Sequence, residues 1–257
     1  MLSERRALVT GAAGGIGRAT AVKAAAQGAS HVAVADVDTC RLGDTARAVR
    51  SAGAECLEVS VDLRAPAEIE RMVRSTVEWA GGLDVLVNNA GIFDRAFTSP
   101  EQACLEDLPE EAWEAVYDVN VRAAWLAMKH AARYLRGSDR TPAIVNVASI
   151  AGLTGYREPA YTSSKGALIQ LTRSAAVNLA PQVRVNCVCP GIVRTPMTDT
   201  HGKNQQVAHR GNLIPRLGEP DELANVIAFL GGDEATFMTG AVVPVDGGTT
   251  AWRGWHD

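Results

Sequence analysis

Short apolar runs alternate with longer amphipathic stretches along the whole chain. The runs are rich in valine and alanine and lie at residues 7–10, 31–36, 55–60, 85–88, 144–148, 183–189 and 242–245. The stretches with helical character lie at residues 16–27, 40–52, 66–79, 110–136, 160–180 and 221–230. Because the runs are apolar at nearly every position, they predict strands that are buried on both faces. We therefore expect an α/β fold, a seven-stranded doubly wound parallel sheet with helices on both faces.

Length and composition fit one such unit. The chain has 257 residues, and no Pro/Ser-rich linker or change of composition divides it, so we expect a single domain over residues 1–257. Hydrophobic residues make up 47% of the sequence and charged residues 21%, which is typical of a globular protein with a substantial core. The net charge of −4 and the lack of a Lys/Arg run argue against nucleic acid as a partner.

Targeting and metal signals are weak. The first strand-like run begins near residue 6, which leaves no room for a secretory signal, and no segment has the roughly 18 consecutive apolar residues of a membrane span. We expect a cytoplasmic protein with reduced thiols and no membrane partner. Cys187 and Cys189 permit two interpretations, a metal pair or one face of a buried strand, and the apolar run around them favours the strand. The five histidines are dispersed, so no metal site is expected.

A glycine-rich turn connects the first strand to the first helix. Residues 10–17 read TGAAGGIG, and glycine lets the backbone turn tightly and approach phosphate groups at a helix N-terminus. We expect Gly11, Gly15, Ile16 and Gly17 to line the pyrophosphate of a dinucleotide, which makes the sheet a Rossmann fold.

Asp36 ends the second strand. It follows Gly17 by 19 residues, near the separation expected of an acid that binds the adenosine ribose. Its carboxylate would accept hydrogen bonds from the 2′-hydroxyl of NAD and repel the 2′-phosphate of NADP. Neither Ala13 nor Val37 supplies a compensating positive charge, so we expect NAD as the cofactor. The alternative is that Asp36 serves only as a helix cap or a solvated turn residue.

Tyr161 and Lys165 stand four positions apart in a predicted helix, and Ser149 follows a predicted strand upstream. A tyrosine hydroxyl has an ordinary pKa of about 10 and exchanges protons poorly at neutral pH unless a nearby cation favours its phenolate. The ammonium of Lys165 supplies such a cation one helical turn away. Alone, the pair also fits an aromatic ring stacked on a lysine stem. Together with the glycine turn and Ser149, it predicts hydride transfer.

The chain resembles the short-chain dehydrogenase/reductase family over nearly its whole length. The resemblance rests on motifs that occur in the family's order: the glycine turn, Asp62, the NNAG sequence at residues 88–91, Asn120, Ser149, the Tyr161/Lys165 pair and the PGIVRTPM sequence at residues 190–197.

The resemblance implies catalytic roles for four residues. Tyr161 would be the general acid or base, and Lys165 would hold the cofactor ribose and lower the pKa of the tyrosine. Ser149 would bind the substrate oxygen, and Asn120 would help to hold a water-linked proton relay. Without the resemblance, Ser149 is explained equally well as a strand-end cap and Asn120 as a helix residue bonded to its own turn.

The resemblance also implies further cofactor contacts. Asp62 would meet the adenine amino group, and Asn89 and Gly91 would border the path of the adenosine and ribose. Ile192 and Thr195 would contact the nicotinamide carboxamide. From the residues alone, an aspartate after a strand or an Asn-Ala-Gly turn indicates only turn chemistry.

The leading functional prediction is an NAD(H)-dependent oxidoreductase that interconverts a secondary alcohol and a ketone of small or medium size. The first alternative is an NADPH-dependent reductase of carrier-linked 3-ketoacyl thioesters, against which Asp36 argues. The second is a dinucleotide-binding sensor without turnover, against which the complete set of Ser149, Tyr161 and Lys165 argues. Substrate choice is expected to reside in residues 93–107, 154–158 and 195–214, the last of them a lid.

Quaternary structure is predicted by resemblance alone. Members of the family often form tetramers through two long helices, here residues 110–136 and 160–180, so we expect a homotetramer. The C-terminal tail carries Trp252 and Trp255, and aromatic residues at a chain end often pack on a neighbouring subunit.

Overall fold

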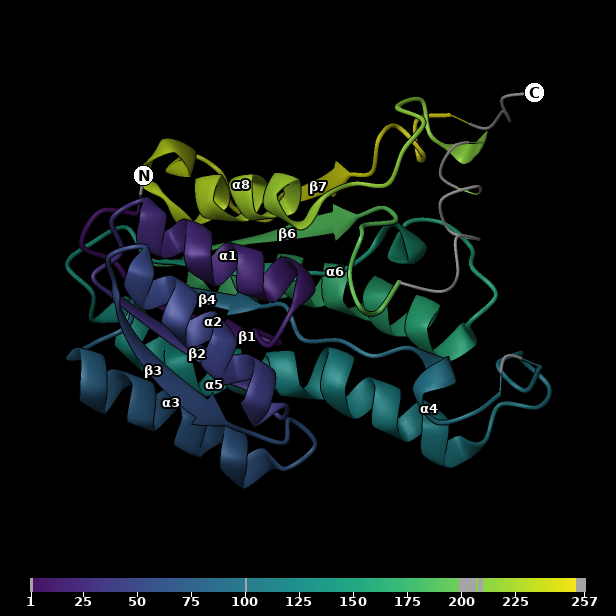
Figure 1. Ribbon diagram of the computed structural model, residues 1–257, viewed down its shortest axis with the longest axis horizontal. Helices are drawn as coiled ribbons and strands as arrows, with labels where there is room; N and C mark the ends of the chain where they lie inside the picture. The colour runs from purple at the N-terminus through teal and green to yellow at the C-terminus, as the bar shows by residue number, and fades with distance from the viewer. Residues whose placement is uncertain (1, 100, 199–206, 208–209, 253–257) are drawn as a thin grey trace.

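A seven-stranded parallel sheet forms the centre of the computed structural model, which describes residues 2–99, 101–198, 207 and 210–252 (Figure 1). The strand order is β3-β2-β1-β4-β5-β6-β7. The strands are β1 (Arg6–Thr10), β2 (His31–Asp36), β3 (Glu55–Ser60), β4 (Val85–Asn88), β5 (Ala143–Val147), β6 (Arg184–Pro190) and β7 (Val242–Val245). The predicted fold class and all seven strands are confirmed. β5 and β6 are displaced by one residue from their predicted bounds, and β1 begins one residue earlier.

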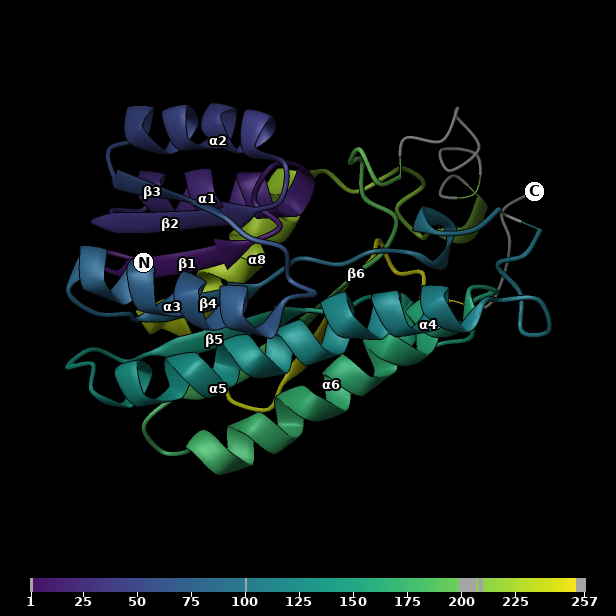
Figure 2. The same cartoon turned by 90° about the horizontal axis from the view of Figure 1, so that it is seen from below.

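Helices cover both faces of this sheet (Figures 1 and 2). One face carries α1 (Gly15–Ala26), α2 (Thr39–Ser51) and α8 (Pro220–Gly231), and the other carries α3 (Pro66–Ala80), α5 (Ala123–Arg136) and α6 (Pro159–Leu179). Alternate strand residues feed the two cores: Val9 packs with the first set of helices and Leu8 with the second. Burial on both faces explains why the strands are apolar at almost every position.

Local signals in the sequence set several helix ends. The side chain of Asp38 caps α2 by accepting a hydrogen bond from the backbone N–H of Arg41 at 3.1 Å. α3 begins at Pro66 and ends where Gly81 takes a left-handed conformation with φ of 72°. Glu219 and Glu222 form a reciprocal capping box at the start of α8.

The prediction of one regular α-helix over residues 110–136 is wrong in one respect, because a π-helical turn interrupts the α-helix. α4 (Glu110–Tyr117) and α5 are joined by η2 (Asp118–Arg122), which is a π-helical turn. A π turn inserts one residue into the helical register without breaking the helix, so it leaves no gap in the hydrophobic pattern. Three short 3₁₀ turns were also not expected: η1 (Asp94–Ala96), η3 (Ile150–Gly152) and η4 (Asp233–Ala235).

The residues at the amino ends of the strands differ in chemistry from those at the carboxyl ends. At the amino ends of the strands, Asp84 is fully buried, and it accepts hydrogen bonds from Arg6 Nη2 at 2.7 Å and Ser138 Oγ at 2.6 Å. At the carboxyl ends the strand order reverses between β1 and β4, which is where sheets of this kind bind ligands.

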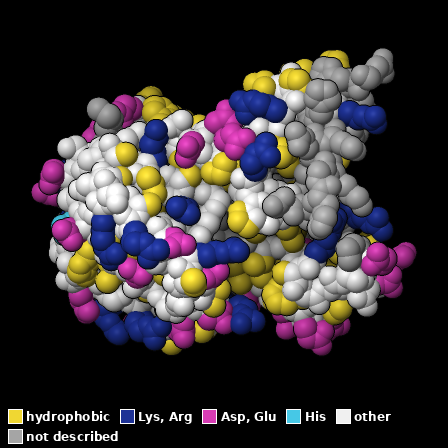
Figure 3. Space-filling model, in the orientation of Figure 1, with side chains coloured by type: hydrophobic (Ala, Val, Ile, Leu, Met, Phe, Trp, Pro, Cys, Tyr) yellow, Lys and Arg dark blue, Asp and Glu magenta, His cyan; other side chains and the backbone are white. Residues whose placement is uncertain are grey.

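The surface carries charges of both signs. In the space-filling view they are interspersed, and the face is hollowed between the larger body and the part that carries α4 (Figure 3). Among the helices of the described residues, none combines the length and apolarity needed to cross a bilayer.

Candidate active site

The glycine-rich turn lies between the carboxyl end of β1 and α1. Gly11 and Gly15 have φ of 66° and 52°, which residues with a Cβ rarely adopt. A Cβ at Gly17 would stand 2.2 Å from the carbonyl oxygen of Gly11, so the turn closes only with glycine there. Gly14 precedes α1 and has no side chain to cap it, so the first amides of the helix remain available to an anion such as pyrophosphate. Ile16 packs against the core from the first turn of α1.

Asp36 lies beside this turn. Its carboxylate accepts hydrogen bonds from the backbone N–H of Ala13 at 3.0 Å and of Asp38 at 3.1 Å. The hydrogen bond from Ala13 joins the end of β2 to the glycine turn. It therefore holds the Asp36 carboxylate beside the turn that is predicted to bind the pyrophosphate.

Asn89 joins the loops that follow β1 and β4. Its side-chain nitrogen donates to the carbonyl oxygens of Thr10 at 2.9 Å and Gly11 at 3.1 Å. In return, Thr10 Oγ1 accepts a hydrogen bond from the backbone N–H of Asn89 at 3.1 Å. These hydrogen bonds hold the two loops together at the point where the strand order reverses.

Asp62 follows β3 and is paired with Arg64. The Asp62 carboxylate accepts hydrogen bonds from Arg64 Nη2 at 2.7 Å and from the backbone N–H of Arg64 at 2.9 Å. These hydrogen bonds hold the pKa of Asp62 below its usual range. The carboxylate therefore stays an acceptor, as contact with an adenine amino group requires.

The loop after β6 lies over the glycine turn. A Cβ at Gly15 would stand 3.0 Å from the methyl carbon of Thr195, and the carbonyl oxygen of Ile192 accepts a hydrogen bond from Gly218 at 3.0 Å. Part of the predicted lid, residues 199–206 and 208–209, lies outside the described residues.

Ser149, Tyr161 and Lys165 meet at the carboxyl end of β5. Ser149 follows the strand and caps η3 through a hydrogen bond from Ala151, while Tyr161 lies in the first turn of α6 and Lys165 one turn further on. Tyr161 and Lys165 are only 9% and 3% exposed. Lys165 Nζ donates to the carbonyl oxygen of Val147 at 3.0 Å and lies 5.7 Å from the centre of the Tyr161 ring.

Asn120 lies in the π turn and faces this group of residues. Its Oδ1 accepts from the backbone N–H of Ile92 at 2.9 Å, and its Nδ2 donates to the Ile92 carbonyl oxygen and to Ser164 Oγ, each at 3.0 Å. A Cβ at Gly91 would stand 3.0 Å from Lys165 Nζ and 3.3 Å from Asn120 Oδ1. Gly91 therefore leaves the space that Lys165 and Asn120 need.

Burial determines the protonation of the central pair. It raises the pKa of Tyr161 to about 12, although the hydrogen bond with Ser149 acts in the opposite direction. It lowers the pKa of Lys165 to about 8. In the protein alone, Lys165 therefore does not bring the pKa of the tyrosine below its ordinary value.

Comparisons with known proteins identify the family. A family model described as enoyl-(acyl carrier protein) reductase matches residues 11–250. The cis-4-hydroxycyclohexanecarboxylate dehydrogenase of Sinomonas cyclohexanicum is 39% identical over 252 residues, covering 97% of this chain and 98% of that protein. The 3-oxoacyl-[acyl-carrier-protein] reductase FabG of Thermotoga maritima is 34% identical over 244 residues, covering 94% of this chain and 96% of that protein.

A solved structure agrees with these sequence matches. A short chain dehydrogenase from Burkholderia cenocepacia in complex with NADP superimposes with a TM-score of 0.87 at 32% identity, covering 97% of this chain and 99% of that one. The chain belongs to the short-chain dehydrogenase/reductase family. The predicted resemblance is thereby confirmed, and with it an NAD(P)-dependent oxidoreductase.

The residues that the dehydrogenase presents at the carboxyl edge of its sheet fit a dinucleotide. The uncapped N-terminus of α1 and the glycine turn suit a pyrophosphate, and Asp36 lies beside them at the end of β2. Thr195 packs against the same turn from the loop after β6, and Lys165 lies next to Gly91 after β4. The predicted cofactor and catalytic residues thus line one continuous edge from β3 to β6.

No individual role was predicted for Phe93 or Asp94, which lie in the loop at residues 93–107. The Phe93 ring packs on the Tyr161 ring with centroids 4.3 Å apart. Asp94 is fully buried and accepts hydrogen bonds from the backbone N–H groups of Ala160 and Tyr161. No spacing rule could reveal contacts between residues more than 60 positions apart.

Cys187 and Cys189 lie on a buried strand, as the apolar run at residues 183–189 predicts. Cys187 and Cys189 are both fully buried on β6, which confirms the strand interpretation. Among the described residues, no three side chains of His, Cys, Asp or Glu gather in a way that could hold a metal ion.

Proposed function

We propose that the dehydrogenase interconverts a secondary alcohol and a ketone with NAD(H) as cofactor and Tyr161 as general acid/base. The observation that carries the proposal is the buried group of Ser149, Tyr161 and Lys165, which lies at the same sheet edge as the glycine turn. Within this group the Tyr161 hydroxyl has a hydrogen bond with Ser149, and the Lys165 ammonium lies 5.7 Å from the centre of its ring.

The chemistry follows from this arrangement. In the oxidative direction Tyr161 Oη takes the hydroxyl proton of the alcohol, while Ser149 Oγ binds the same oxygen and stabilises charge as it develops. The dinucleotide, when bound, supplies the acceptor for the hydride that leaves the carbon. The products are a ketone, the reduced dinucleotide and one proton, and reduction reverses each transfer.

Lys165 and Asn120 complete the proposed machinery. The Lys165 ammonium is held by Val147 and would bind the cofactor ribose from beneath the tyrosine. Asn120 fixes the Ile92 backbone on both its N–H and carbonyl sides. From this position Asn120 would help to hold a water-linked relay that carries the proton from Tyr161 to solvent.

NAD is the cofactor that Asp36 favours. A carboxylate beside the glycine turn accepts hydrogen bonds from a ribose 2′-hydroxyl and repels a 2′-phosphate. The NADP-bound relative from Burkholderia cenocepacia shows that NADP occurs on this fold, so charge at residue 36 is the property to test.

Asp36→Asn tests this assignment directly. The amide keeps an acceptor oxygen but removes the charge, so the ratio of kcat/KM for NAD to that for NADP should fall about tenfold or more. Asp38→Asn is the matched control, because asparagine also caps a helix and the ratio should stay as in the wild type. An unchanged ratio in Asp36→Asn would remove Asp36 from cofactor selection.

A cyclic secondary alcohol is the substrate class that we favour. The support is the 39% identical relative, whose name gives a hydroxycyclohexane as substrate. The rival is reduction of a carrier-linked 3-ketoacyl thioester with NADPH, which the description of the family model and the Thermotoga maritima relative favour. Asp36 weighs against the rival. A dinucleotide sensor without turnover is the third reading, and the intact Ser149, Tyr161 and Lys165 weigh against it.

One assay separates these readings. Absorbance at the nicotinamide band is followed with NAD and with NADP over cyclic alcohols, polyols, hydroxy steroids and a 3-ketoacyl thioester. NAD-linked oxidation of an alcohol supports the proposal. Turnover of the thioester with NADPH alone would establish the rival, and tight NADH binding without any turnover would establish the sensor.

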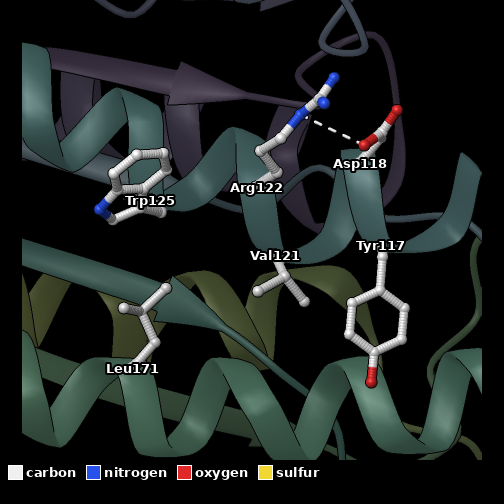
Figure 4. A pocket seen from close by; sticks show the side chains of 6 residues that line it. All are labelled: Tyr117, Asp118, Val121, Arg122, Trp125 and Leu171. Atoms are coloured by element: carbon white, nitrogen blue, oxygen red, sulfur yellow. Dashed lines mark ion pairs between the residues drawn. The ribbon is translucent and has the colours of Figure 1, made fainter. Parts of the chain in front are cut away.

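The homotetramer is proposed from the helices on one side of the sheet. A groove of about 410 Å³ runs between η2, α5 and α6 and is lined by Tyr117, Asp118, Val121, Arg122, Trp125 and Leu171 (Figure 4). Trp125 is 46% exposed there, and Val177 on α6 is 81% exposed. Exposed apolar side chains of this kind are typical of a protein interface, and a second copy of the chain is the partner that we propose.

A further proposal concerns the whole chain. We propose that residues 1–257 act as a single dinucleotide-binding domain, because the predicted site draws residues from β1 through the loop after β6. Trp252 is 42% exposed, and the remainder of the predicted tail contact, residues 253–257, lies outside the described residues.

A further inference from the structure

The first turn of α6 is capped from a distant loop. α6 begins with Pro159, which has no N–H, and its N-cap Glu158 makes no side-chain hydrogen bond to the helix. The next two amides, of Ala160 and Tyr161, would therefore lack a partner in a buried place. Asp94 supplies one for each: its Oδ2 accepts from Ala160 at 3.0 Å and its Oδ1 accepts from Tyr161 at 2.7 Å.

The position of Asp94 makes this contact stronger than a surface cap. The residue is 0% exposed, and both of its carboxylate oxygens are engaged with the same helix end. Hydrogen bonds to a charged acceptor are stronger than neutral ones, and a negative charge is stabilised at a helix N-terminus. The side chain thus ties the loop after β4 to the backbone of the candidate catalytic residue itself.

Neighbouring contacts fix the same short segment. The Phe93 ring packs on the Tyr161 ring at 4.3 Å with an interplanar angle of 55°. On the other side of Asp94, Arg95 forms an ion pair with Glu158. Ile92, at the start of the segment, is held by Asn120 through two backbone hydrogen bonds. The loop therefore contacts both the backbone and the ring of Tyr161.

We propose that Asp94 is a positioning residue for the reaction, which sets the place of the Tyr161 hydroxyl relative to Ser149 and the substrate by fixing the first turn of α6. This inference rests on the proposed role of Tyr161 as general acid/base. It adds a residue that touches neither substrate nor cofactor and acts through the tyrosine backbone.

Asp94→Ala and Asp94→Asn test it. Alanine removes both acceptors, whereas asparagine keeps one acceptor oxygen and turns an N–H group toward the other amide. Because a misplacement of about 1 Å at a reacting group can cost 10²-fold, we expect kcat to fall by roughly 10- to 100-fold in Asp94→Ala and by less in Asp94→Asn. The dissociation constant of NADH should change less than about twofold, since Asp94 is separate from the glycine turn.

The pH profile separates positioning from a structural role. The hydrogen bond with Ser149 lowers the pKa of Tyr161, so a displaced tyrosine should show its kinetic pKa in kcat at higher pH. Asp84→Asn is the matched control, because Asp84 is an equally buried carboxylate at the opposite edge of the sheet. It should lower the melting temperature and leave kcat per folded enzyme and the kinetic pKa as in the wild type.

Three outcomes are decisive. A graded loss of kcat with a raised kinetic pKa and retained NADH affinity supports the inference. A lower melting temperature with wild-type kcat and pH profile in both Asp94 variants overturns it, and so does a loss of NADH affinity in proportion to kcat. The wild-type protein is assayed first with the alcohol panel, so that an absence of turnover there counts against the proposed function and not against Asp94.

Discussion

Lys165 occupies an environment that opposes its own charge. Its ammonium lies in a buried site, where it donates a hydrogen bond to the carbonyl oxygen of Val147, and burial lowers its pKa to about 8. Tyr161 beside it meets the opposite effect, because burial raises its pKa to about 12. The nicotinamide ring of an oxidised dinucleotide carries a positive charge, which would favour the phenolate if the ring were bound beside Tyr161.

Lys165→Met should alter both stability and function. The folded-state pKa of Lys165 lies below the ordinary 10.5, so between pH 8 and 10.5 the unfolded chain binds more protons than the folded chain. The contribution of this residue to the free energy of unfolding is present above pH 10.5 and is lost as the pH falls through 8. The loss amounts to up to about 3 kcal/mol.

Denaturant unfolding of wild type and Lys165→Met at pH 7 to 10 measures this contribution. We expect the stability advantage of the methionine variant to be largest near pH 7 and to shrink toward pH 10. Turnover and NADH affinity should both fall in the variant, since the ammonium is proposed to serve both. Parallel stability curves would show that burial does not lower the pKa of Lys165 in the folded protein.

The candidate site residues could be predicted from the sequence where their roles depend on their spacing along the chain. The four-residue step from Tyr161 to Lys165 fixes their common helix face, and the 19 residues from Gly17 to Asp36 span one helix and one strand. The effect of burial on the pKa of Tyr161 was not readable, because the residues that exclude water come from other parts of the chain. The cap by Asp94 was hidden for the same reason.

At the scale of elements, the strands were predictable because each is apolar on both faces. β2 illustrates this: its residues from Val32 to Ala35 are all fully buried, with alternate side chains in the two cores. The π turn at Asp118–Arg122 was not predictable, since one extra residue in a helix changes its register and not its composition. This turn carries Asn120, so part of the candidate site depends on a feature that periodicity does not record.

Gly17→Ala tests the turn between β1 and α1. The added Cβ would stand 2.2 Å from the Gly11 carbonyl oxygen, so the turn must open and the phosphate site must deform. We expect the dissociation constant of NADH to rise about tenfold or more, measured by fluorescence titration.

Gly43→Ala is the control for this variant. It places the same methyl group on α2, where the nearest side-chain atom is 3.6 Å away, and NADH affinity should remain within about twofold of the wild type. Equal affinity in both variants would show that the glycine turn does not hold the pyrophosphate.

At the scale of the molecule, the strand order brings the carboxyl ends of β1, β4, β5 and β6 to one edge. Site residues between Gly11 and Thr195 meet there, and at the amino ends of the strands the buried carboxylate of Asp84 pairs with the partly exposed Arg6. The parallel order was expected from the alternation of runs and helices. The groove beside Trp125 was not, because the sequence shows which helices are long and not which of their faces stays uncovered.

Trp125→Glu tests the proposed tetramer. A carboxylate at this position would have to lose its hydration at the interface and would remove the apolar contact of the indole ring, so the assembly should dissociate into smaller species. Light scattering should give about four times the chain mass of 27.1 kDa for the wild type and less for the variant. Leu105→Glu, a similar change at an 84% exposed loop position, should keep the wild-type mass. A wild-type mass in Trp125→Glu would place the interface elsewhere.

The measurement that tests the central claim most directly compares wild type and Tyr161→Phe in NAD-linked oxidation of the best alcohol from the panel. Phenylalanine keeps the ring and its packing on Phe93 and removes the hydroxyl group that carries the transferable proton. We expect kcat to fall by at least about 10³-fold, with the NADH dissociation constant within about twofold of the wild type. Turnover comparable to the wild type in Tyr161→Phe would contradict the assignment of Tyr161 as the general acid/base.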